Sequence, residues 1–345
     1  MVLEPGEGPP RDPGGSAQPG ASLGGRCPAC GGELIGWRPA TASDPQLAGR
    51  RRYALARCTA CGTARTEIPP GEVPPPALYE AGTYAAAPPG VERILEPLRA
   101  LLERDKLRFV RDWPRGAHVL EVGAGDGRFV SRLRDAGFDA TGIEPSEGAV
   151  RMARARAAPV EHAALEEFRR EPDSLDGAIA WHVLEHLDDP GEALARIGAW
   201  LRPGGRVVVA CPNLASLQAR IGGDRWFHQD VPRHRTHFTA SGLRLLLERS
   251  GFGLGRMSHL LLEQNPLGMW QTLLNRVTRE RDVAFRALKR DLDDGPGIGR
   301  DLALTAVAGP LLAPVAVALE VAAGIARRGG TVVALAERRS GSTAR

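Results

Sequence analysis

Four of the five cysteines form two Cys-x-x-Cys pairs, Cys27 with Cys30 and Cys58 with Cys61. Glycine follows each pair, as in tight turns whose backbone amides point at sulfur. Four thiolates in this pattern predict a closed, structural zinc site, and the alternative is a redox dithiol or a disulfide. The fifth cysteine, Cys211, lies in an apolar strand-like run and is expected to be ordinary core.

A second group of residues could hold a nucleotide. Three glycines follow the strand-like run in VLEVGAGDGRF: Gly123, Gly125 and Gly127. A ligand that rests against backbone at the end of a strand requires residues without a Cβ there. Glu121 precedes the loop, and Glu144 ends the next strand-like run, where an acid can accept both ribose hydroxyls. An NAD-binding domain is the alternative, although such loops usually carry an apolar residue in place of Glu121.

A third group, in the segment WHVLEHLDDP, contains His182, Glu185 and His186. On a helix these three side chains share one face, and with His237 from the later segment PRHRTHF they could hold a divalent metal. Alternatively, His182 acts alone as a general base or polar lining, or Glu185 and His186 only brace the following helix. The spelling H-x-x-E-H also matches inverted zinc proteases, but here it follows a buried strand of a nucleotide-binding pattern.

The elements that must position these groups alternate along the chain. Strand-like runs at 118–123, 140–145, 175–182 and 206–212 alternate with helical runs, and later strands are expected near 257–262 and at 331–337. This alternation predicts an α/β fold with a doubly wound, parallel sheet. Ligands bind at the carboxyl ends of such strands, where the second and third groups fall.

The motifs together resemble the class I S-adenosylmethionine-dependent methyltransferases. The resemblance covers roughly residues 118–255, extends to CPN (211–213) and GGDRWFHQDVPRHRTHF (222–238), and is most specific for the subgroup related to ubiquinone-biosynthesis O-methyltransferases. It implies a Rossmann-like sheet of seven strands. It also implies that the cofactor contacts are Glu121, Gly123, Gly125, Gly127, Glu144, Leu165 and Trp181. Among these, Glu144 would hold the ribose and Leu165 would lie near the adenine.

Two further resemblances concern the metal and the linker. Metal-dependent small-RNA 2′-O-methyltransferases carry a similar E-x-x-E-H, but His182 replaces their first Glu, which puts the ligand set in question. Mixed His and Glu ligands suit zinc, iron or manganese better than magnesium. The segment ALYEAGTYA resembles the Leu-Tyr segment after zinc ribbons of bacterial methyltransferases, which implies that Tyr79 or Tyr84 covers the cofactor pocket; packing on the domain is the alternative.

The domain organisation follows from these motifs and from composition. We expect a disordered tail (1–25), a zinc ribbon (26–66), a proline-rich linker (67–90) and a methyltransferase domain (91–339) with a helical apolar insertion (263–328). Arginines are spread along the whole chain of 345 residues, whose net charge is +4, so a nucleic-acid partner is not expected. The N-terminus lacks the pattern of a secretory signal, which predicts a cytoplasmic protein.

The apolar run 302–325 is long enough to span a bilayer. We expect Pro310 and Pro314 to break its helix, and a single span would separate the strand 331–337 from its own sheet. Three roles are therefore considered, in this order: a buried helical cap, a lid for a lipid-like substrate, and a membrane-surface element that makes peripheral contact.

The sequence thus predicts transfer of a methyl group from S-adenosylmethionine to an acceptor, with a hydroxyl of a small or lipid-linked molecule as the expected group. An RNA methyltransferase and a non-catalytic S-adenosylmethionine-binding regulator are the alternatives.

Overall fold

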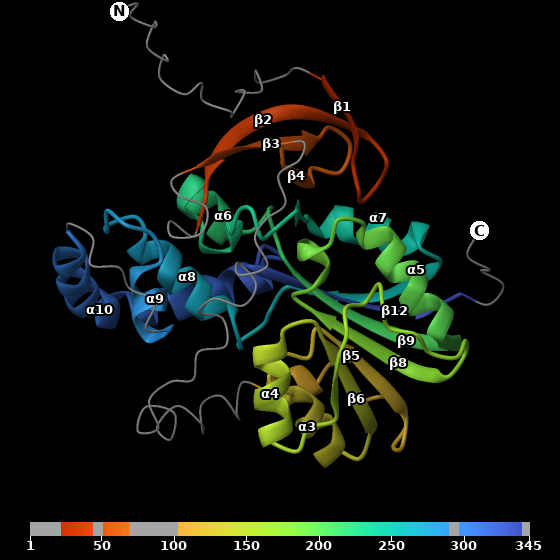
Figure 1. Ribbon diagram of the computed structural model, residues 1–345. Coiled ribbons are helices and arrows are strands. Elements are labelled where there is room, and N and C mark those ends of the chain that lie inside the picture. Colours follow the sequence, from red (N-terminus) through yellow and green to blue (C-terminus); the bar gives the residue numbers. More distant parts are fainter. Residues whose placement is uncertain (1–21, 44–50, 70–102, 290–296, 340–345) are drawn as a thin grey trace, which may run out of the picture.

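The computed structural model describes residues 22–43, 51–69, 103–289 and 297–339, which form a large sheet flanked by helices and a smaller sheet above it (Figure 1). The large sheet has the order β11-β12-β9-β8-β5-β6-β7. Its strands are β5 (His118–Val122), β6 (Asp139–Glu144), β7 (Val160–His162), β8 (Leu175–Trp181), β9 (Leu201–Pro212), β11 (Phe252–Ser258) and β12 (Thr331–Arg338). Only β12 runs antiparallel to its neighbours, β9 and β11, so the predicted α/β fold with a seven-stranded Rossmann-like sheet is confirmed.

Helices cover both faces of this sheet, so β8 and the second half of β9 are buried. They are α3 (Arg128–Asp135), α4 (Glu147–Ala155), α5 (Pro190–Trp200), α6 (Leu217–Gly222) and α7 (Ala240–Arg249). Side chains cap several of them: Ser146 accepts from the Ala149 amide at the start of α4, and Thr239 accepts from Gly242 at the start of α7. Their apolar faces complete two hydrophobic clusters, one on each side of the sheet.

The smaller sheet contains the cysteine pairs. It consists of β1 (Ser22–Arg26), β2 (Glu33–Thr41), β3 (Arg52–Cys58) and β4 (Ala64–Glu67), followed by β10 (Thr236–His237) from the large domain. The strand β1 begins inside the stretch predicted to be a disordered tail. β10 pairs antiparallel with β4, with Thr236 opposite Arg65 and His237 opposite Ala64. The cysteine module is therefore hydrogen-bonded directly to the domain that follows it. The predicted linker lies largely outside the described residues, as do Tyr79 and Tyr84.

Three helices lie between β11 and β12: α8 (Asn265–Leu274), α9 (Val283–Lys289) and α10 (Ile298–Ile325). The expectation that Pro310 and Pro314 break the last helix is wrong, since α10 runs through both. The two prolines are four residues apart and both are exposed, so their rings meet no neighbouring element. The first of the three roles considered, a buried cap, is also wrong, because only 11% of the most apolar window of α10 is buried. By length and composition alone, α10 could cross a membrane. That this segment is an insertion stays a prediction.

Candidate active site

The glycine loop lies at the carboxyl end of β5, at the centre of the large sheet. Gly123 and Gly127 both have positive φ angles, of 70° and 73°. A Cβ on Gly123 would lie 2.5 Å from Cγ2 of Val183, and one on Gly127 would lie 2.5 Å from Cβ of Ala158. Glycine is therefore required at both positions by backbone conformation and by packing. The two glycines thus let the loop pack closely against Val183 and Ala158.

Glu144 ends the neighbouring strand β6 and faces this loop. Its carboxylate accepts from the backbone amides of Gly125 and Ser146, each at 2.9 Å. Burial raises the pKa of Glu144, while these two amides oppose the shift. Two fixed hydrogen bonds hold the carboxylate in one orientation, so its remaining lone pairs are available to a ligand's hydroxyl groups. Leu165 is buried in the adjoining core; its role near the adenine stays a prediction.

A buried set of charges lies on the other side of the loop. Glu121 is 3% exposed, and its Oε2 has no hydrogen-bond partner among the described residues. Burial raises the pKa of Glu121 to about 8, against the opposing charge of Lys106. Lys106 also pairs with Glu263 at 2.8 Å, and Trp181 donates its indole N–H to the same carboxylate at 3.1 Å. Sequence reasoning did not find Lys106 or Glu263, because each belongs to a segment without a motif.

His182 follows β8, beside the glycine loop. It adopts a positive φ of 56°, which is unusual for a residue with a side chain and is typical of functional sites. Its Nδ1 lies 3.0 Å from Oε1 of Glu185, and its Nε2 is buried without a hydrogen-bond partner among the described residues. Burial raises the pKa of Glu185, but the hydrogen bond and charge of His182 outweigh it, and the net pKa falls to about 2. An ionised Glu185 therefore holds Nδ1–H, which leaves Nε2 as a proton acceptor.

Glu185 also belongs to a group that could hold a metal. Glu185, His186 and His234 each offer one ligand atom, and the three atoms lie within 4.8 Å of one another. The prediction had placed His237 here instead. His237 points to the cysteine module, where its Nε2 lies 3.0 Å from Oγ1 of Thr66. Both histidines belong to the singled-out segment PRHRTHF, but the sequence could not tell which of them faces Glu185.

His228 completes the histidine cluster, which we define as His182, His186, His228, His234 and His237. The ring of His228 stacks on that of His182 with centroids 6.1 Å apart. Burial, together with neighbouring histidine charge, lowers the pKa of His186 to about 4 and the pKa of both His228 and His237 to about 3. Cys211 is fully buried beside Glu185. Burial raises the pKa of its thiol, and the charge of that carboxylate raises it further.

The four clustered cysteines of the small sheet have the geometry of a metal centre. Sγ of Cys27 lies 3.6 Å from that of Cys61, and Sγ of Cys30 lies 3.4 Å from that of Cys58. In a tetrahedral zinc site the Zn–S bonds of about 2.3 Å place sulfurs about 3.8 Å apart, close to these values. Both pairs end in matching turns, in which the amides of Gly31 and Gly62 donate to the carbonyls of Cys27 and Cys58, and both glycines have φ 75°. The residues fit zinc.

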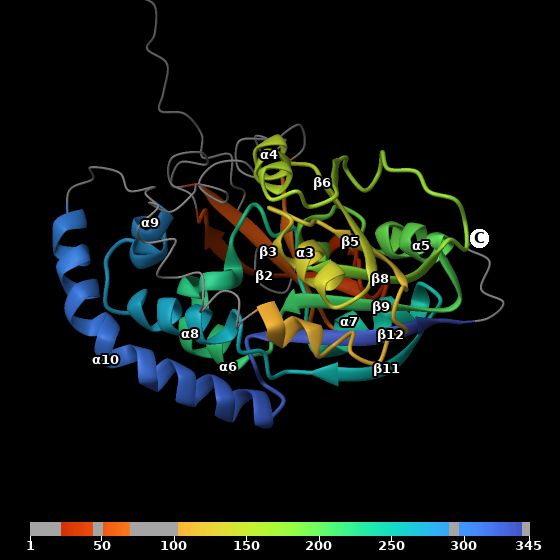
Figure 2. The ribbon, with the colours of Figure 1, turned by 90° about the horizontal axis from the view of Figure 1, so that it is seen from below.

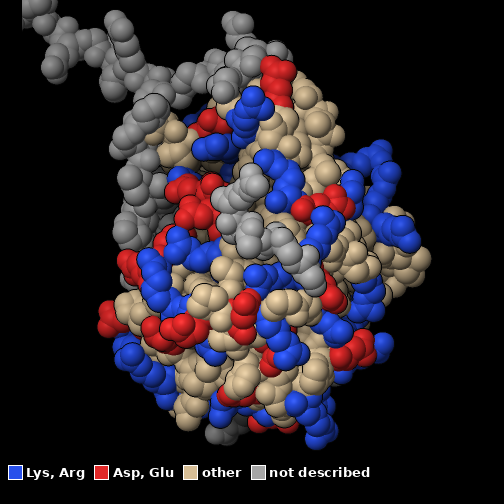
Figure 3. Space-filling model, turned by 90° about the vertical axis from the view of Figure 1, so that its right-hand side faces the viewer, with Lys and Arg blue, Asp and Glu red and all other residues tan. Residues whose placement is uncertain are grey.

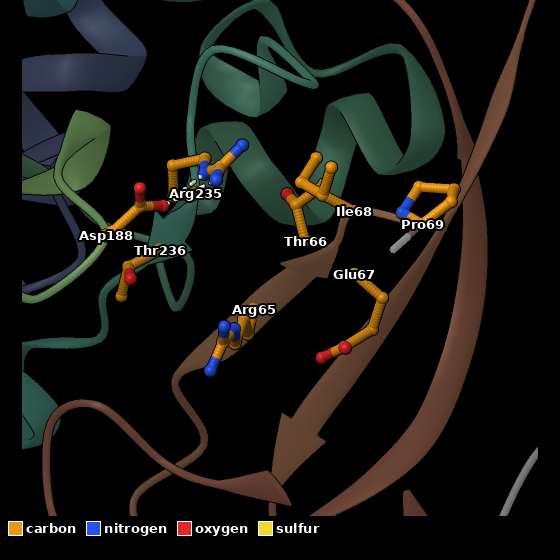
Figure 4. A pocket seen from close by; sticks show the side chains of 8 residues that line it. All are labelled: Arg65, Thr66, Glu67, Ile68, Pro69, Asp188, Arg235 and Thr236. Atoms are coloured by element: carbon orange, nitrogen blue, oxygen red, sulfur yellow. Dashed lines mark hydrogen bonds and ion pairs between the residues drawn. The ribbon is translucent and has the colours of Figure 1, made fainter. Parts of the chain in front are cut away.

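The cysteine module reaches the histidine cluster through side chains as well as through β10. Thr66 donates to the carbonyl of His234 at 2.7 Å, and Thr239 donates to the carbonyl of Cys61 at 2.7 Å. A polar pocket of about 210 Å³ opens along this seam (Figure 4). Its lining residues are Arg65, Thr66, Glu67, Ile68, Pro69, Asp188, Arg235 and Thr236. Arg235 pairs with Asp188 across the pocket, and its amide donates to the carbonyl of Glu185 at 2.7 Å.

The fold is a Rossmann-like sheet with a glycine loop at the carboxyl end of its central strand β5. Residues 94–254 match a family model described as "Methyltransferase domain", and this part of the chain is a methyltransferase domain.

Proteins of similar sequence include two that carry the name of a methyltransferase. The chain is similar to a "Probable S-adenosylmethionine-dependent methyltransferase" of Mycolicibacterium smegmatis (strain ATCC 700084 / mc(2)155), with 32% identity over 40% of this chain and 52% of the relative. It is 36% identical to an "Uncharacterized protein" of Mycobacterium tuberculosis (strain ATCC 25618 / H37Rv), over 31% of this chain and 42% of the relative. A "Ubiquinone biosynthesis O-methyltransferase" of Azorhizobium caulinodans is 25% identical over 50% of this chain and 70% of that protein. The chain thus spans about half the length of the first two relatives.

Solved structures resemble the chain more loosely. The putative methyltransferase complex with the Haloferax volcanii Trm112 activator gives a TM-score of 0.48 at 16% identity, covering 75% of this chain and 97% of that chain. The [4+2]-cyclase SpnF gives 0.46 at 21% identity, covering 69% and 81%. Likenesses of this degree carry no functional argument.

Proposed function

We propose that the protein transfers a methyl group from S-adenosylmethionine to a hydroxyl oxygen of a small or lipid-linked acceptor. The observation that carries the proposal is the juxtaposition of two sites at one edge of the sheet. The glycine loop with Glu144 ends β5 and β6, and His182 ends β8, which is the next strand. A cofactor held on the loop would present its reactive end toward His182.

The residues at the loop fit S-adenosylmethionine. The oriented carboxylate of Glu144 suits the two ribose hydroxyls, and the unpartnered Oε2 of Glu121 suits the ammonium group of the amino-acid part. Lys106, buried next to Glu121, suits the carboxylate of that same part. The bound cofactor supplies an activated methyl group on a sulfonium, so the domain's own task is to bind, orient and exclude water.

His182 is the proposed general base. Its Nδ1–H is held by the ionised Glu185, so Nε2 can accept the proton that the acceptor hydroxyl loses as its oxygen attacks the methyl group. Because φ of His182 is positive, its side chain leaves the backbone in a different direction from that of a residue that continued β8 as an extended strand.

A divalent metal is the second element proposed for this site. The ring of His186 is held through Nδ1 by the carbonyl of Arg233 at 3.2 Å, and the ring of His234 is held through Nδ1 by the carbonyl of His228 at 2.9 Å. Backbone carbonyls orient metal-binding histidines in this way. With Glu185 they would form a mixed His and Glu set that suits zinc, iron or manganese, and the ion would lower the pKa of an acceptor hydroxyl.

The cysteine module is proposed to bind one structural zinc ion. All four thiols are used, so no coordination position remains for substrate. Its proposed role is mechanical, because its strand β4 and Thr66 support the segment that carries His234 and His237.

The RNA alternative is not favoured by the surface. Figure 3 shows Lys and Arg side chains interspersed with Asp and Glu among the described residues of the face that it presents. RNA-binding domains typically gather basic side chains into one stripe.

The proposal is tested by metal content and turnover together. Purified protein incubated with radiolabelled S-adenosylmethionine and a cell extract should transfer label to an extractable product. Elemental analysis should show that Cys58→Ser loses the zinc of the cysteine module, and that His234→Ala keeps this zinc but loses any second metal. Label transfer in wild type without a second metal would leave His182 as the sole base, whereas absence of cofactor binding and of transfer would defeat the proposal.

A further inference from the structure

The exposed apolar surface of the protein is concentrated in one region. Among the described residues, every exposed large hydrophobic side chain lies between β11 and β12. These residues are Leu262, Leu267, Val277, Leu288, Val307, Leu311, Val315, Val317 and Ile325. Five of them belong to α10, where Val307 is 71% exposed, Leu311 70% and Ile325 75%. Soluble monomers rarely leave large apolar patches in water, so another apolar phase or molecule is expected to cover these side chains.

The orientation of α10 about its axis is fixed by its two acidic residues, which face inward. Asp301 is fully buried and accepts from the backbone amides of Arg279 and Glu280 at 2.9 and 2.8 Å. Glu320 is 2% exposed and accepts from the amide of Gly330 at 3.2 Å. The usual arrangement of a surface helix is thereby inverted, with the acids inside and the apolar side chains outside.

Exposed cations lie at both ends of this helix. Arg300 is in its first turn, and Arg327 and Arg328 follow its last residue. The exposed positions between Leu302 and Ile325 carry no charge. An apolar stretch bounded by arginines matches a lipid surface, where the apolar side chains meet acyl chains and the guanidinium groups meet phosphates.

The two ends of α10 are tied to the same body, which argues against a membrane-spanning helix. At its start, Asp301 binds the loop after α8. At its end, the carbonyl of Arg328 accepts from the amide of Leu217, and β12 then enters the sheet between β9 and β11. Figure 2 shows α10 running along the outer side of the molecule beside α8. A helix of 28 residues, about 42 Å long, can lie flat on a bilayer in this arrangement.

We propose that α10 docks in the headgroup region of an anionic lipid bilayer, with Val307, Leu311 and Ile325 among the acyl chains and the terminal arginines at lipid phosphates. The docking does not depend on the chemistry of the active site. One helix, α8, separates this surface from the histidine cluster. Its Trp270 donates to the carbonyl of Gly309 in α10 at 2.8 Å, and a Cβ on its Gly268 would lie 2.6 Å from Nε2 of His228. If methyl transfer is correct as proposed, a lipid-linked acceptor lies close to the domain that modifies it.

Vesicle flotation of the full chain tests the docking. Wild type should float with vesicles of phosphatidylcholine mixed with phosphatidylglycerol, and less with phosphatidylcholine alone. The double variant Val307→Asp/Leu311→Asp should bind at least about tenfold more weakly, because both side chains are predicted to enter the acyl region. Arg327→Gln/Arg328→Gln should weaken binding to the anionic vesicles alone, by about fivefold per arginine.

The matched control adds the same two charges on other helices, as Ala155→Asp/Ala199→Asp, at exposed positions of α4 and α5. It should float like wild type, and cofactor affinity should report that all variants are folded. Failure of wild type to float, or equal flotation of the α10 variant, would overturn the proposal. A wild-type dimer in light scattering that Val307→Asp/Leu311→Asp converts to monomer, without vesicle binding, would assign the surface to a second copy instead.

Discussion

The glycine loop follows β5, and the histidine cluster begins at His182, after the adjacent strand β8. The two sites differ in how far apart in the chain their residues are. The loop needs backbone from one short stretch, Gly123–Gly127, and a single carboxylate one strand later. The cluster is assembled from side chains of η1 (Leu184–His186) and its flanks, of η3 (Phe227–Gln229) and β10, and is supported by Thr66 of the cysteine module. The loop can therefore tolerate changes far away, whereas the cluster depends on the whole arrangement of two sheets.

The largest difference between the two sites is expected for His182→Ala. The rate of methyl transfer should fall about 10²–10⁴-fold, because the proposed base is removed, while the affinity for S-adenosylmethionine stays within about twofold. Label transfer and calorimetry measure the two quantities. The control His118→Ala, at the exposed start of β5, should change neither. Equal losses of rate and affinity in His182→Ala would mean that the two sites are not separable.

Glu144→Ala should have the opposite profile. Loss of a carboxylate that is proposed to hold two ribose hydroxyls should weaken cofactor affinity about 10–100-fold, by the usual strength of hydrogen bonds to charged groups. The control Glu161→Ala removes an exposed acid from the neighbouring strand β7. Calorimetry measures the affinity. Unchanged affinity in Glu144→Ala would show that this carboxylate does not hold the ribose.

Cys58→Ser tests the support of the cluster by the cysteine module. Zinc should be lost, and the transfer rate should fall about tenfold or more, since β4 and Thr66 no longer hold β10. Cofactor affinity should stay within about twofold. Cys211→Ala serves as the control for zinc content, which should be that of wild type. Full activity of zinc-free Cys58→Ser would show that the module does not position the cluster.

The last comparison concerns the pH dependence of stability, where the two sites should differ in sign. Burial raises the pKa of Glu121 from 4.5 to about 8, so the folded state retains a proton and stability falls as pH rises between these values. Burial lowers the pKa of His228 from 6.5 to about 3, so the unfolded state gains a proton and stability falls as pH drops through that range. Each group contributes up to about 1.4 kcal/mol per pH unit.

Urea unfolding of the cofactor-free protein at several pH values measures both contributions. Glu121→Gln should flatten the loss at alkaline pH, and His228→Gln should flatten the loss at acid pH. Identical profiles in both variants and in wild type would contradict the assigned burial.

The sequence predicts the loop better than the cluster, because the residues of the loop site are close together in the chain and those of the cluster are not. Glu121, the glycines and Glu144 are close in the chain, and the strands that carry them have clear apolar patterns. The strand β10 has two residues, and its partner β4 lies about 170 residues earlier, so no local pattern announces the pairing that turns His237 toward Thr66. The buried side of α10 is equally hard to predict, since its large apolar residues are mostly exposed and the buried positions hold Asp301, Glu320 and small residues.

Calorimetry with S-adenosylhomocysteine and NAD on the purified chain tests the central claim most directly. The account predicts that the demethylated nucleoside binds, that Glu144→Ala weakens this binding, and that NAD shows no heat of binding. Binding of NAD with no response to S-adenosylhomocysteine would contradict the assignment of the loop and of every role derived from it.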